Sequence, residues 1–239
     1  MNLPTKGDGV VRAVSAAMPQ WQDVGGRQVF TSIVRPPSAQ PIWFGPLGPD
    51  GNATAVHTEQ VLAFSSEHYD HWTRRLGVPR DAWDWCHWGE NITLSGLDEN
   101  TLTVGAVVAI GPQARLEVTS PRIPCFKLAW RIGQPDSVLT EITASGWVGI
   151  YLRVLDPGEI GAGDTVRVES QAEAAITVGD LSRLLNDASV TDTALLRRVL
   201  ANPALGGQAR GMIRNRVARI EDQAADNAAG FGEVFARHR

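Results

Sequence analysis

The sequence predicts a mainly β protein, with a β-barrel followed by a small C-terminal module of three helices. Up to about residue 170, short apolar or alternating runs are separated by Gly, Pro, Asp and Asn turns at a spacing of roughly 8 to 12 residues, which is typical of barrels and sandwiches. After Gln171, Ala, Leu and Arg become more frequent and the apolar spacing shifts from two towards three and four, as in amphipathic helices. We therefore expect a barrel domain (1–170), a three-helix module (171–224) and a C-terminal tail (225–239).

The expected strands begin near the N-terminus. Residues 9–15 alternate apolar and polar side chains, and residues 28–35 do so in part, so both are expected to be half-buried strands. Residues 36–52 are rich in Pro and Gly and are expected to form a long surface loop or a pair of loops. Further strands are expected at 61–64, 92–94, 101–104, 106–110, 115–119, 148–155 and 165–169.

The expected helices carry recognisable ends. A helix is predicted to begin at Ser65 or Ser66 and to end at Gly77, because Ser is a good N-cap and Gly a common C-cap. The tryptophan-rich run 83–88 is expected to plug a core or a barrel end, or to line an interface. The three helices of the C-terminal module are expected to start after Thr177, after Thr191 or Thr193, and from Leu205.

Composition and charge exclude several classes of protein. The formal net charge of −4 argues against a nucleic-acid binder, which usually has a basic face. No segment approaches the roughly 18 consecutive apolar residues of a membrane span, and the N-terminus lacks the pattern of a secretory signal. The two cysteines, Cys86 and Cys125, do not make a disulfide framework. We expect a cytoplasmic protein with free thiols that binds neither membranes nor nucleic acids.

The stretch 120–128 concentrates chemistry that the rest of the chain largely lacks. Its two prolines predict a rigid loop rather than a helix or a central strand. Cys125 lies between two cations, Arg122 and Lys127, and nearby cations lower the pKa of a thiol and favour the reactive thiolate. The alternative is that Cys125 is a small, inert, buried residue beside a stiff turn.

The same stretch resembles the cysteine motif of MOSC domains, the module named after the C-terminal part of molybdenum cofactor sulfurase, and in particular its YiiM-like branch. The resemblance covers nearly the whole chain, including the three-helix module. The other matching segments fall in the family's order: 31–37, 47–51, His57, 67–69, Gly89-Glu90-Asn91 with Ile92-Thr93, 96–97, 104–105 and 149–154.

The resemblance implies that Cys125 is the catalytic residue and a metal ligand, with its sulfur bound to the molybdenum of molybdopterin. A soft thiolate suits such a centre. The phosphate of the cofactor needs cationic donors, and Arg122, Lys127 and Arg35 are the candidates.

Two further segments are implied at the cofactor pocket. Glu90 and Asn91 correspond to a family motif there, where a carboxylate and an amide read the donor and acceptor edge of the pterin; the alternative is a turn in which Asn91 bonds its own backbone. His57 corresponds to the histidine that opens the family's His-Gly-Gly loop. This chain departs from that loop, because Thr58-Glu59-Gln60 follow and add bulk and negative charge where glycines let backbone amides approach a phosphate.

The family resemblance implies a molybdenum-cofactor-dependent oxidoreductase that reduces N-hydroxylated small molecules. The electrons are expected from an external flavoprotein or ferredoxin-type partner, because this chain lacks the cysteines of an iron–sulfur cluster. Similar proteins suggest a homodimer. Two alternatives stay open: a cofactor-free MOSC-like enzyme that uses Cys125 for sulfur transfer or nucleophilic chemistry, and a non-catalytic carrier or interaction module.

Overall fold

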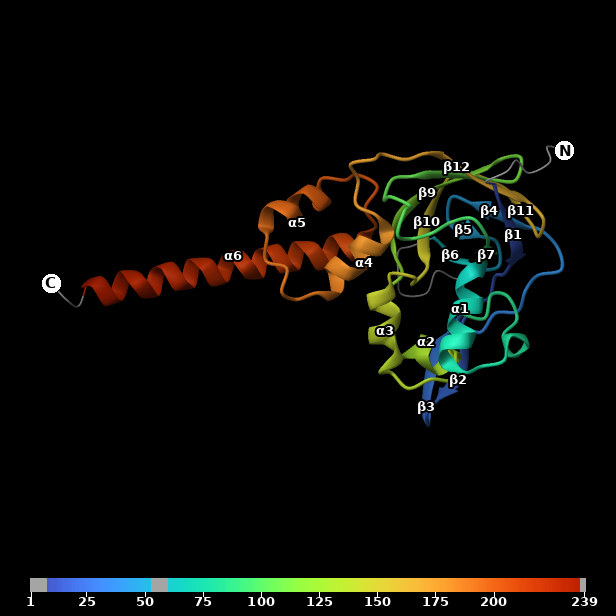
Figure 1. The fold of residues 1–239 in the computed structure, drawn as a ribbon, viewed down its shortest axis with the longest axis horizontal. Helices are drawn as coiled ribbons and strands as arrows, with labels where there is room; N and C mark the ends of the chain where they lie inside the picture. The colour runs from blue at the N-terminus through green and yellow to red at the C-terminus, as the bar shows by residue number, and fades with distance from the viewer. Residues whose placement is uncertain (1–7, 53–59, 237–239) are drawn as a thin grey trace.

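The computed structural model describes residues 8–52 and 60–236. A barrel with its associated helices forms one part of the molecule, and three C-terminal helices form the other (Figure 1). The predicted fold class is confirmed. The predicted site residue His57, with Thr58 and Glu59, lies outside the described residues.

The strands are β1 (Gly9–Val14), β2 (Gln20–Val24), β3 (Arg27–Thr31), β4 (Ile42–Gly45), β5 (Gly48–Pro49), β6 (Val61–Ser65), β7 (Ile92–Leu94), β8 (Val107–Ile110), β9 (Ala114–Pro121), β10 (Ile150–Asp156), β11 (Gly158–Ile160) and β12 (Thr165–Ser170). The helices are α1 (Ser66–Leu76), the 3-10 turn η1 (Arg80–Ala82), α2 (Phe126–Arg131), α3 (Val138–Ser145), α4 (Val178–Asn186), α5 (Thr193–Leu200) and α6 (Gly207–Ala236).

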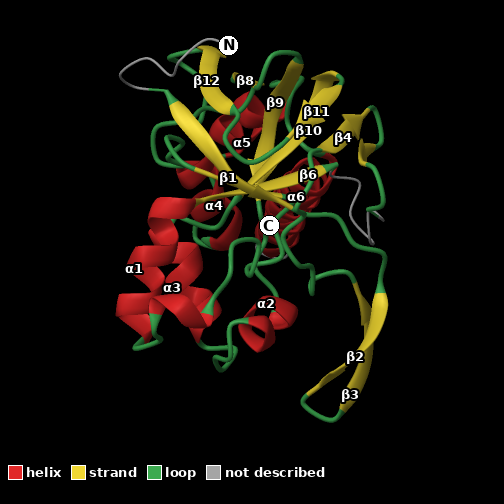
Figure 2. Cartoon of the chain, turned by 90° about the vertical axis from the view of Figure 1, so that its right-hand side faces the viewer, coloured by secondary structure: helices red, strands yellow, loops and turns green. Residues whose placement is uncertain are grey.

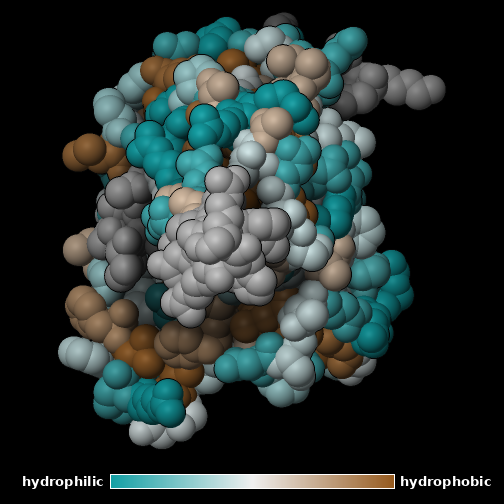
Figure 3. All heavy atoms as spheres, turned by 90° about the vertical axis from the view of Figure 1, so that its left-hand side faces the viewer, coloured by the Kyte–Doolittle hydropathy of each residue, from teal (hydrophilic) through white to brown (hydrophobic). Residues whose placement is uncertain are grey.

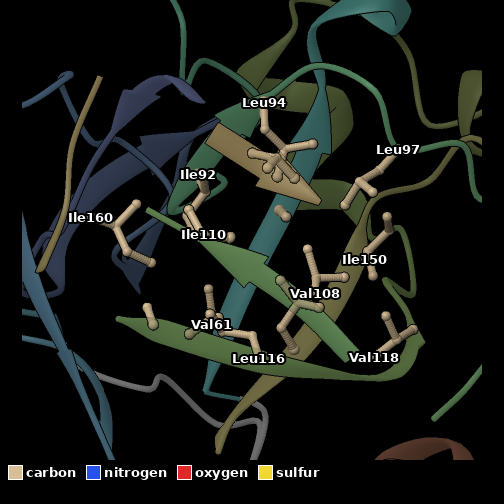
Figure 4. Close-up of a cluster of buried hydrophobic side chains, with 14 of the residues drawn as sticks. Val61, Ile92, Leu94, Leu97, Val108, Ile110, Leu116, Val118, Ile150 and Ile160 are labelled. Carbon is tan, nitrogen blue, oxygen red and sulfur yellow. The ribbon is translucent and has the colours of Figure 1, made fainter. Parts of the chain in front are cut away.

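Seven strands close the barrel in the order β1-β12-β8-β9-β10-β6-β7, and β7 pairs back onto β1. All neighbours are antiparallel except β6 and β7, which run parallel with α1 and η1 between them in the chain. Alternate side chains of each strand point inward and fill the barrel (Figure 4). The described residues therefore fill the interior as a packed apolar core. Labelled residues of this core are Val61, Ile92, Leu94, Leu97, Val108, Ile110, Leu116, Val118, Ile150 and Ile160.

One end of the barrel is covered by α1, α2 and α3 (Figure 2). A second apolar core fills the space beneath them, built around Phe64, Trp72, Trp83 and Trp88. Phe64 and Trp88 stack with ring centroids 4.6 Å apart. Of the three indoles in the run 83–88, those of Trp83 and Trp88 are buried, so most of this run plugs the barrel end.

Three predictions about the barrel domain were wrong. Residues 28–35 do not form a half-buried strand: β3 pairs only with β2, and this hairpin projects from the barrel with Trp21 and Phe30 exposed (Figure 2). Residues 36–52 are not only loop, because they contain β4 and β5, and β4 pairs with both β5 and β11. Residues 101–104 form a turn closed on the Asp98 carbonyl, with a single bridge from Thr103 to Thr177.

The C-terminal helices form the third core. Thr177 caps α4 by accepting a hydrogen bond from the Asp180 amide, and Asp192 caps α5 in the same way. Each such cap stabilises its helix by about 1 kcal/mol. The helix α6 continues without a break through the expected start of the tail at residue 225 and ends at Ala236. Seen from the side where α6 ends, hydrophobic patches gather toward the end of the molecule that carries α1–α3 (Figure 3). Among the described residues, none of the helices has the length and apolar character needed to cross a membrane.

Candidate functional site

The cysteine segment joins β9 to α2 at the covered end of the barrel. β9 runs through Pro121, and α2 begins at Phe126, so only residues 122–125 are loop. The prediction of a loop throughout 120–128 was therefore wrong at both ends. The prolines permit this because Pro121 lies at the strand's last position and Pro124 lies before the first helical residue, where neither ring breaks a helical hydrogen bond.

Cys125 is the N-cap residue of α2 and has an extended backbone. Its side chain is half-buried and its thiol is free. Lys127 lies in the first turn of α2, half-buried, and makes no ion pair or hydrogen bond with another described residue.

Arg122 turns inward under the barrel. Its side chain is 7% exposed and donates to the Trp88 carbonyl at 2.6 Å, while its backbone amide donates to the Gly149 carbonyl at 2.9 Å. The Trp88 bond is the one hydrogen bond its guanidinium makes to a described residue, and a guanidinium has five N–H donors. Several donors of Arg122 thus remain available.

Arg35, which is 8% exposed, lies close enough to Arg122 for the two charges to repel. Its guanidinium donates to the backbone and side-chain oxygens of Ser32 and to Oδ1 of Asn52. Burial lowers the pKa of Arg35 to about 10, with the charge of Arg122 acting in the same direction and that of Glu90 opposing it. Arg35 remains protonated at neutral pH, so an excess of buried positive charge collects at this end of the barrel.

Glu90 is completely buried, and two hydroxyl groups hold its carboxyl group. Oε1 accepts from the Tyr69 hydroxyl at 2.6 Å and from the Thr93 hydroxyl at 2.7 Å. The same hydroxyls accept from consecutive backbone amides, Tyr69 from His87 at 2.9 Å and Thr93 from Cys86 at 2.9 Å. The segment before β7 is thus held by hydrogen bonds that converge on the carboxyl group of Glu90.

The second carboxyl oxygen of Glu90, Oε2, is buried without a hydrogen-bond partner among the described residues. Burial raises the pKa of Glu90, and the hydrogen bonds from Tyr69 and Thr93 and the charge of Arg122 oppose this rise. Burial also raises the pKa of Tyr69, with the charge of Glu90 adding to the effect. Tyr69 therefore stays a neutral donor to the carboxyl group.

Asn91 cross-links the strands around the site. Its Oδ1 accepts from the Leu62 amide at 3.1 Å, and its Nδ2 donates to the Ser15 carbonyl at 3.1 Å and to Oδ1 of Asn52 at 3.3 Å. These contacts use both ends of its amide, and none of them is to its own backbone. The side chain connects β6, the end of β1 and Asn52, whose Oδ1 also accepts from Arg35.

The thiol of the other cysteine, Cys86, is unreactive. Cys86 is fully buried, and burial raises the pKa of its thiol to about 12, with the charge of Glu90 adding to the rise. Cys86 also has a positive φ of 65°, an uncommon conformation for a residue other than glycine. Of the two thiols, only that of Cys125 is accessible to chemistry.

A second buried pair supports the start of the cysteine segment. Glu99 and Nε2 of His68 are 2.6 Å apart, and Glu99 also accepts from the Gly149 amide at 3.0 Å. The Gly149 carbonyl in turn accepts from Arg122. Glu99 reaches His68 from a turn that is distant in the sequence.

The predicted residues therefore divide into groups. Arg35, Arg122, Glu90 and Asn91 meet at one end of the barrel, whereas Lys127 contributes no described polar contact there. Sequence reasoning missed the hydroxyls of Tyr69 and Thr93. Thr93 lies three residues from Glu90, but no local pattern indicates that Tyr69, on α1, reaches the same oxygen.

Comparisons with known proteins agree with this architecture. The MOSC domain profile matches residues 42–167. The protein YflK of Bacillus subtilis is 28% identical over 216 residues, which cover 88% of this chain and 95% of that protein. A protein of Gibberella moniliformis named "Reductase" is 28% identical over 194 residues, which cover 79% of this chain but 34% of the relative. The crystal structure of YiiM from Geobacillus stearothermophilus superposes with a TM-score of 0.70 at 27% identity, covering 87% of this chain and 99% of that one.

Proposed function

The chain belongs to the MOSC domain family, and we propose that it is a reductase that uses molybdenum cofactor, held through Cys125, to reduce N-hydroxylated small molecules. One observation carries the proposal: the accessible thiol of Cys125 and the buried guanidinium groups of Arg35 and Arg122 lie at the same end of the barrel. A relative named as a reductase supports the general class of reaction.

The side chains at this end of the barrel fit the chemistry of the cofactor. A thiolate is a suitable soft ligand for the metal, and Cys125 is the accessible thiol. The phosphate of the cofactor is an anion, and Arg122 and Arg35 offer charged N–H donors that bind phosphate oxygens well. The metal, when bound, supplies two-electron redox chemistry.

The remaining residues act as supports in this proposal. Glu90 lies behind the two arginines, fully buried, and offsets part of their charge so that they stay near each other. Asn91 has both ends of its amide occupied by neighbouring strands and Asn52, so we assign it to positioning rather than to reading the edge of the pterin. Lys127 is available for an anion because no described residue pairs with it.

The overall reaction fixes what the partners must supply. Reducing an N–OH group to N–H breaks the N–O bond, consumes two electrons and two protons, and releases water. With two cysteines, one of them buried, the chain does not carry an iron–sulfur cluster of its own. We assign electron delivery to a separate flavoprotein or ferredoxin-type protein. The matched residues make up 34% of the Gibberella relative, so that chain is about three times as long as the match and has room for further modules.

The test is metal and pterin analysis of protein produced in a host that makes the cofactor. We expect close to one molybdenum per chain, its loss in Cys125→Ser, and its retention in Cys86→Ser, which changes the buried thiol as a matched control. Reduction of an aromatic amidoxime with a chemical electron donor is expected to follow the metal content.

Complete absence of molybdenum from the wild-type protein would overturn the proposal. In that case a cyanide-releasable sulfur on Cys125 would assign the protein to sulfur transfer instead, an alternative that Thr58 and Glu59 in place of two glycines favour. Absence of both signals would leave a non-catalytic binding module.

A further inference from the structure

A groove of about 650 Å³ lies between the barrel domain and the helical module, along α3 and α4. Its volume falls in the range of small-molecule sites. Neither the proposed cofactor contacts nor the family resemblance assigns it a role. Its lining comes from three places, the cysteine segment, α3 and the end of α4: Pro124, Leu139, Thr140, Thr143, Ala144, Arg183, Asn186 and Asp187.

The two helices are clamped together at one end of the groove. A Cβ on Gly146, just after α3, would lie 2.6 Å from Nη1 of Arg183 and 3.1 Å from the Cα of Gly179 in α4, so the approach at residue 146 favours glycine. The Gly179 amide donates to the Glu99 carbonyl at 2.7 Å, and Arg183 donates to Oδ1 of Asn100 at 2.9 Å. The helices therefore meet near Gly146 and Gly179 and leave the groove between the remainder of α3 and the end of α4.

The lining suits an uncharged ligand. Groups outside the lining offset its two charges, because Arg183 pairs with Asp180 at 2.8 Å, and Asp187 accepts hydrogen bonds from Ser189 and lies near the charge of Arg216. Leu139, Ala144 and Pro124 provide apolar surface. The hydroxyls of Thr140 and Thr143 and Oδ1 of Asn186 have no hydrogen-bond partner among the residues that the structure describes, and Nδ2 of Asn186 donates to the Ser182 carbonyl. Free donors and acceptors beside apolar surface match a polar but neutral small molecule.

The position of the groove ties it to Cys125. Pro124 forms part of its wall, and the Cα atoms of Pro124 and Cys125 are about 3.8 Å apart, as across any trans peptide. The four-residue segment thus places Arg122 at the buried guanidinium pair and Pro124 at the groove, with Cys125 directly after it. This short segment therefore borders both the proposed cofactor site and the groove.

We infer that the α3–α4 groove is the substrate-binding site of the proposed reductase, and that it takes an uncharged N-hydroxylated molecule held by Thr140, Thr143 and Asn186. This inference rests on the proposed function for the identity of the ligand. It gives the helical module a role, because α4 and its C-cap supply three of the eight residues that line the groove.

The test fills the groove without touching the cofactor contacts. Ala144→Trp places an indole in the groove from an exposed position on α3, and Ala218→Trp makes the same change on the exposed face of α6 as the control. Thr143→Val removes one hydroxyl with little change of shape. The probe is benzamidoxime, an uncharged aromatic N-hydroxylated compound. Binding is measured by calorimetry on the wild type and on Cys125→Ser, and turnover is measured as KM and kcat.

We expect the wild type and Cys125→Ser to bind the probe with similar Kd. Ala144→Trp is expected to raise Kd and KM by about tenfold or more, whereas kcat changes less than about twofold. Thr143→Val is expected to raise Kd and KM by about fivefold. Ala218→Trp is expected to change neither value.

The outcomes separate this inference from the proposed function. If Ala144→Trp turns over the probe with an unchanged KM, the groove is not the substrate site, whereas the proposed reductase activity still holds. A wild-type protein that does not bind the probe would also overturn it. Binding that is lost in Ala144→Trp, in a protein that neither holds molybdenum nor turns over, would uphold the groove as a ligand site and reject the reductase.

Discussion

Removing the hydroxyl of Tyr69 tests whether the carboxyl network around Glu90 holds this end of the barrel together. Tyr69 is fully buried, donates to Glu90 at 2.6 Å and accepts from the His87 amide at 2.9 Å. Tyr69→Phe deletes one hydrogen bond to a carboxyl group and leaves a backbone N–H without its partner. A lost hydrogen bond of this kind costs about 1–2 kcal/mol and an unpaired buried amide about 1–3 kcal/mol, so we expect a loss of about 2–4 kcal/mol.

The assay is urea unfolding followed by circular dichroism, with Thr93→Val as the second member of a double-mutant cycle. Thr93 repeats the arrangement of Tyr69, because it donates to the same Glu90 oxygen and accepts from the Cys86 amide. Since the two hydroxyls share one acceptor, the loss in the double variant is expected to differ from the sum of the single losses by about 0.5–1 kcal/mol.

The pH dependence gives an independent check. The hydrogen bond from Tyr69 lowers the pKa of Glu90 against the effect of burial, so its loss raises that pKa further above its unfolded value. A carboxyl group with a raised folded-state pKa loses stability as the pH rises through that pKa. The gap between wild type and Tyr69→Phe is therefore expected to widen as the pH rises above 4.5, the ordinary pKa of a glutamate. An unfolding free energy within about 0.5 kcal/mol of wild type, or strict additivity in the cycle, would refute the reasoning.

Two further predictions concern the same segment. Burial lowers the pKa of His87 to about 4, so the unfolded chain, with a pKa of about 6.5, takes up the proton first, and stability is lost as the pH falls from 6.5 towards 4. The wild type loses unfolding free energy between pH 7 and pH 5, and in His87→Gln this loss is expected to be smaller by about 1 kcal/mol, a figure that allows for solvent screening of the partly exposed ring. An unchanged pH profile in the variant would contradict this. Gly89 has a φ of 82°, and a Cβ there would lie 2.6 Å from Cγ1 of Ile33, so Gly89→Ala is expected to cost about 2–4 kcal/mol in urea unfolding. Gly163→Ala, at a φ of 94° with no atom within 4 Å, is expected to cost only about 1–2 kcal/mol, and equal losses in the two variants would remove the steric argument.

The wrong predictions have a common physical origin. Residues 28–35 alternate as a half-buried strand does, but alternation does not say which partner covers the apolar face, and here β3 pairs only with β2. β4, β5 and β11 are short and interrupted by Pro and Gly, so their pairing depends on neighbours far away in the chain. The two residues of β5 carry no periodicity of their own. Proline likewise indicates that a helix does not continue through it, but not that one begins two residues later, as α2 does after Pro124.

The sequence by itself determined what depends on local chemistry. It predicted the β-rich first part and the helical last part, the helix that Gly77 ends, the cap at Thr177, and the short motif that places Arg122 three residues before Cys125. Periodicity, capping and a contiguous motif involve neighbours along the chain, so the residues alone carry them.

Only the tertiary structure decided which distant groups share a low-dielectric space. It brings Arg35 near Arg122, lets the hydroxyls of Tyr69 and Thr93 donate to one oxygen of Glu90, and places Pro124 in one groove with α3 and the end of α4. The Glu90 contacts depend on barrel pairing, because Thr93 lies in β7, Glu90 lies just before it, and Tyr69 lies on α1, which follows the neighbouring strand β6. Burial then sets the pKa values of Glu90, Cys86 and Arg35, and leaves Cys125 as the accessible thiol.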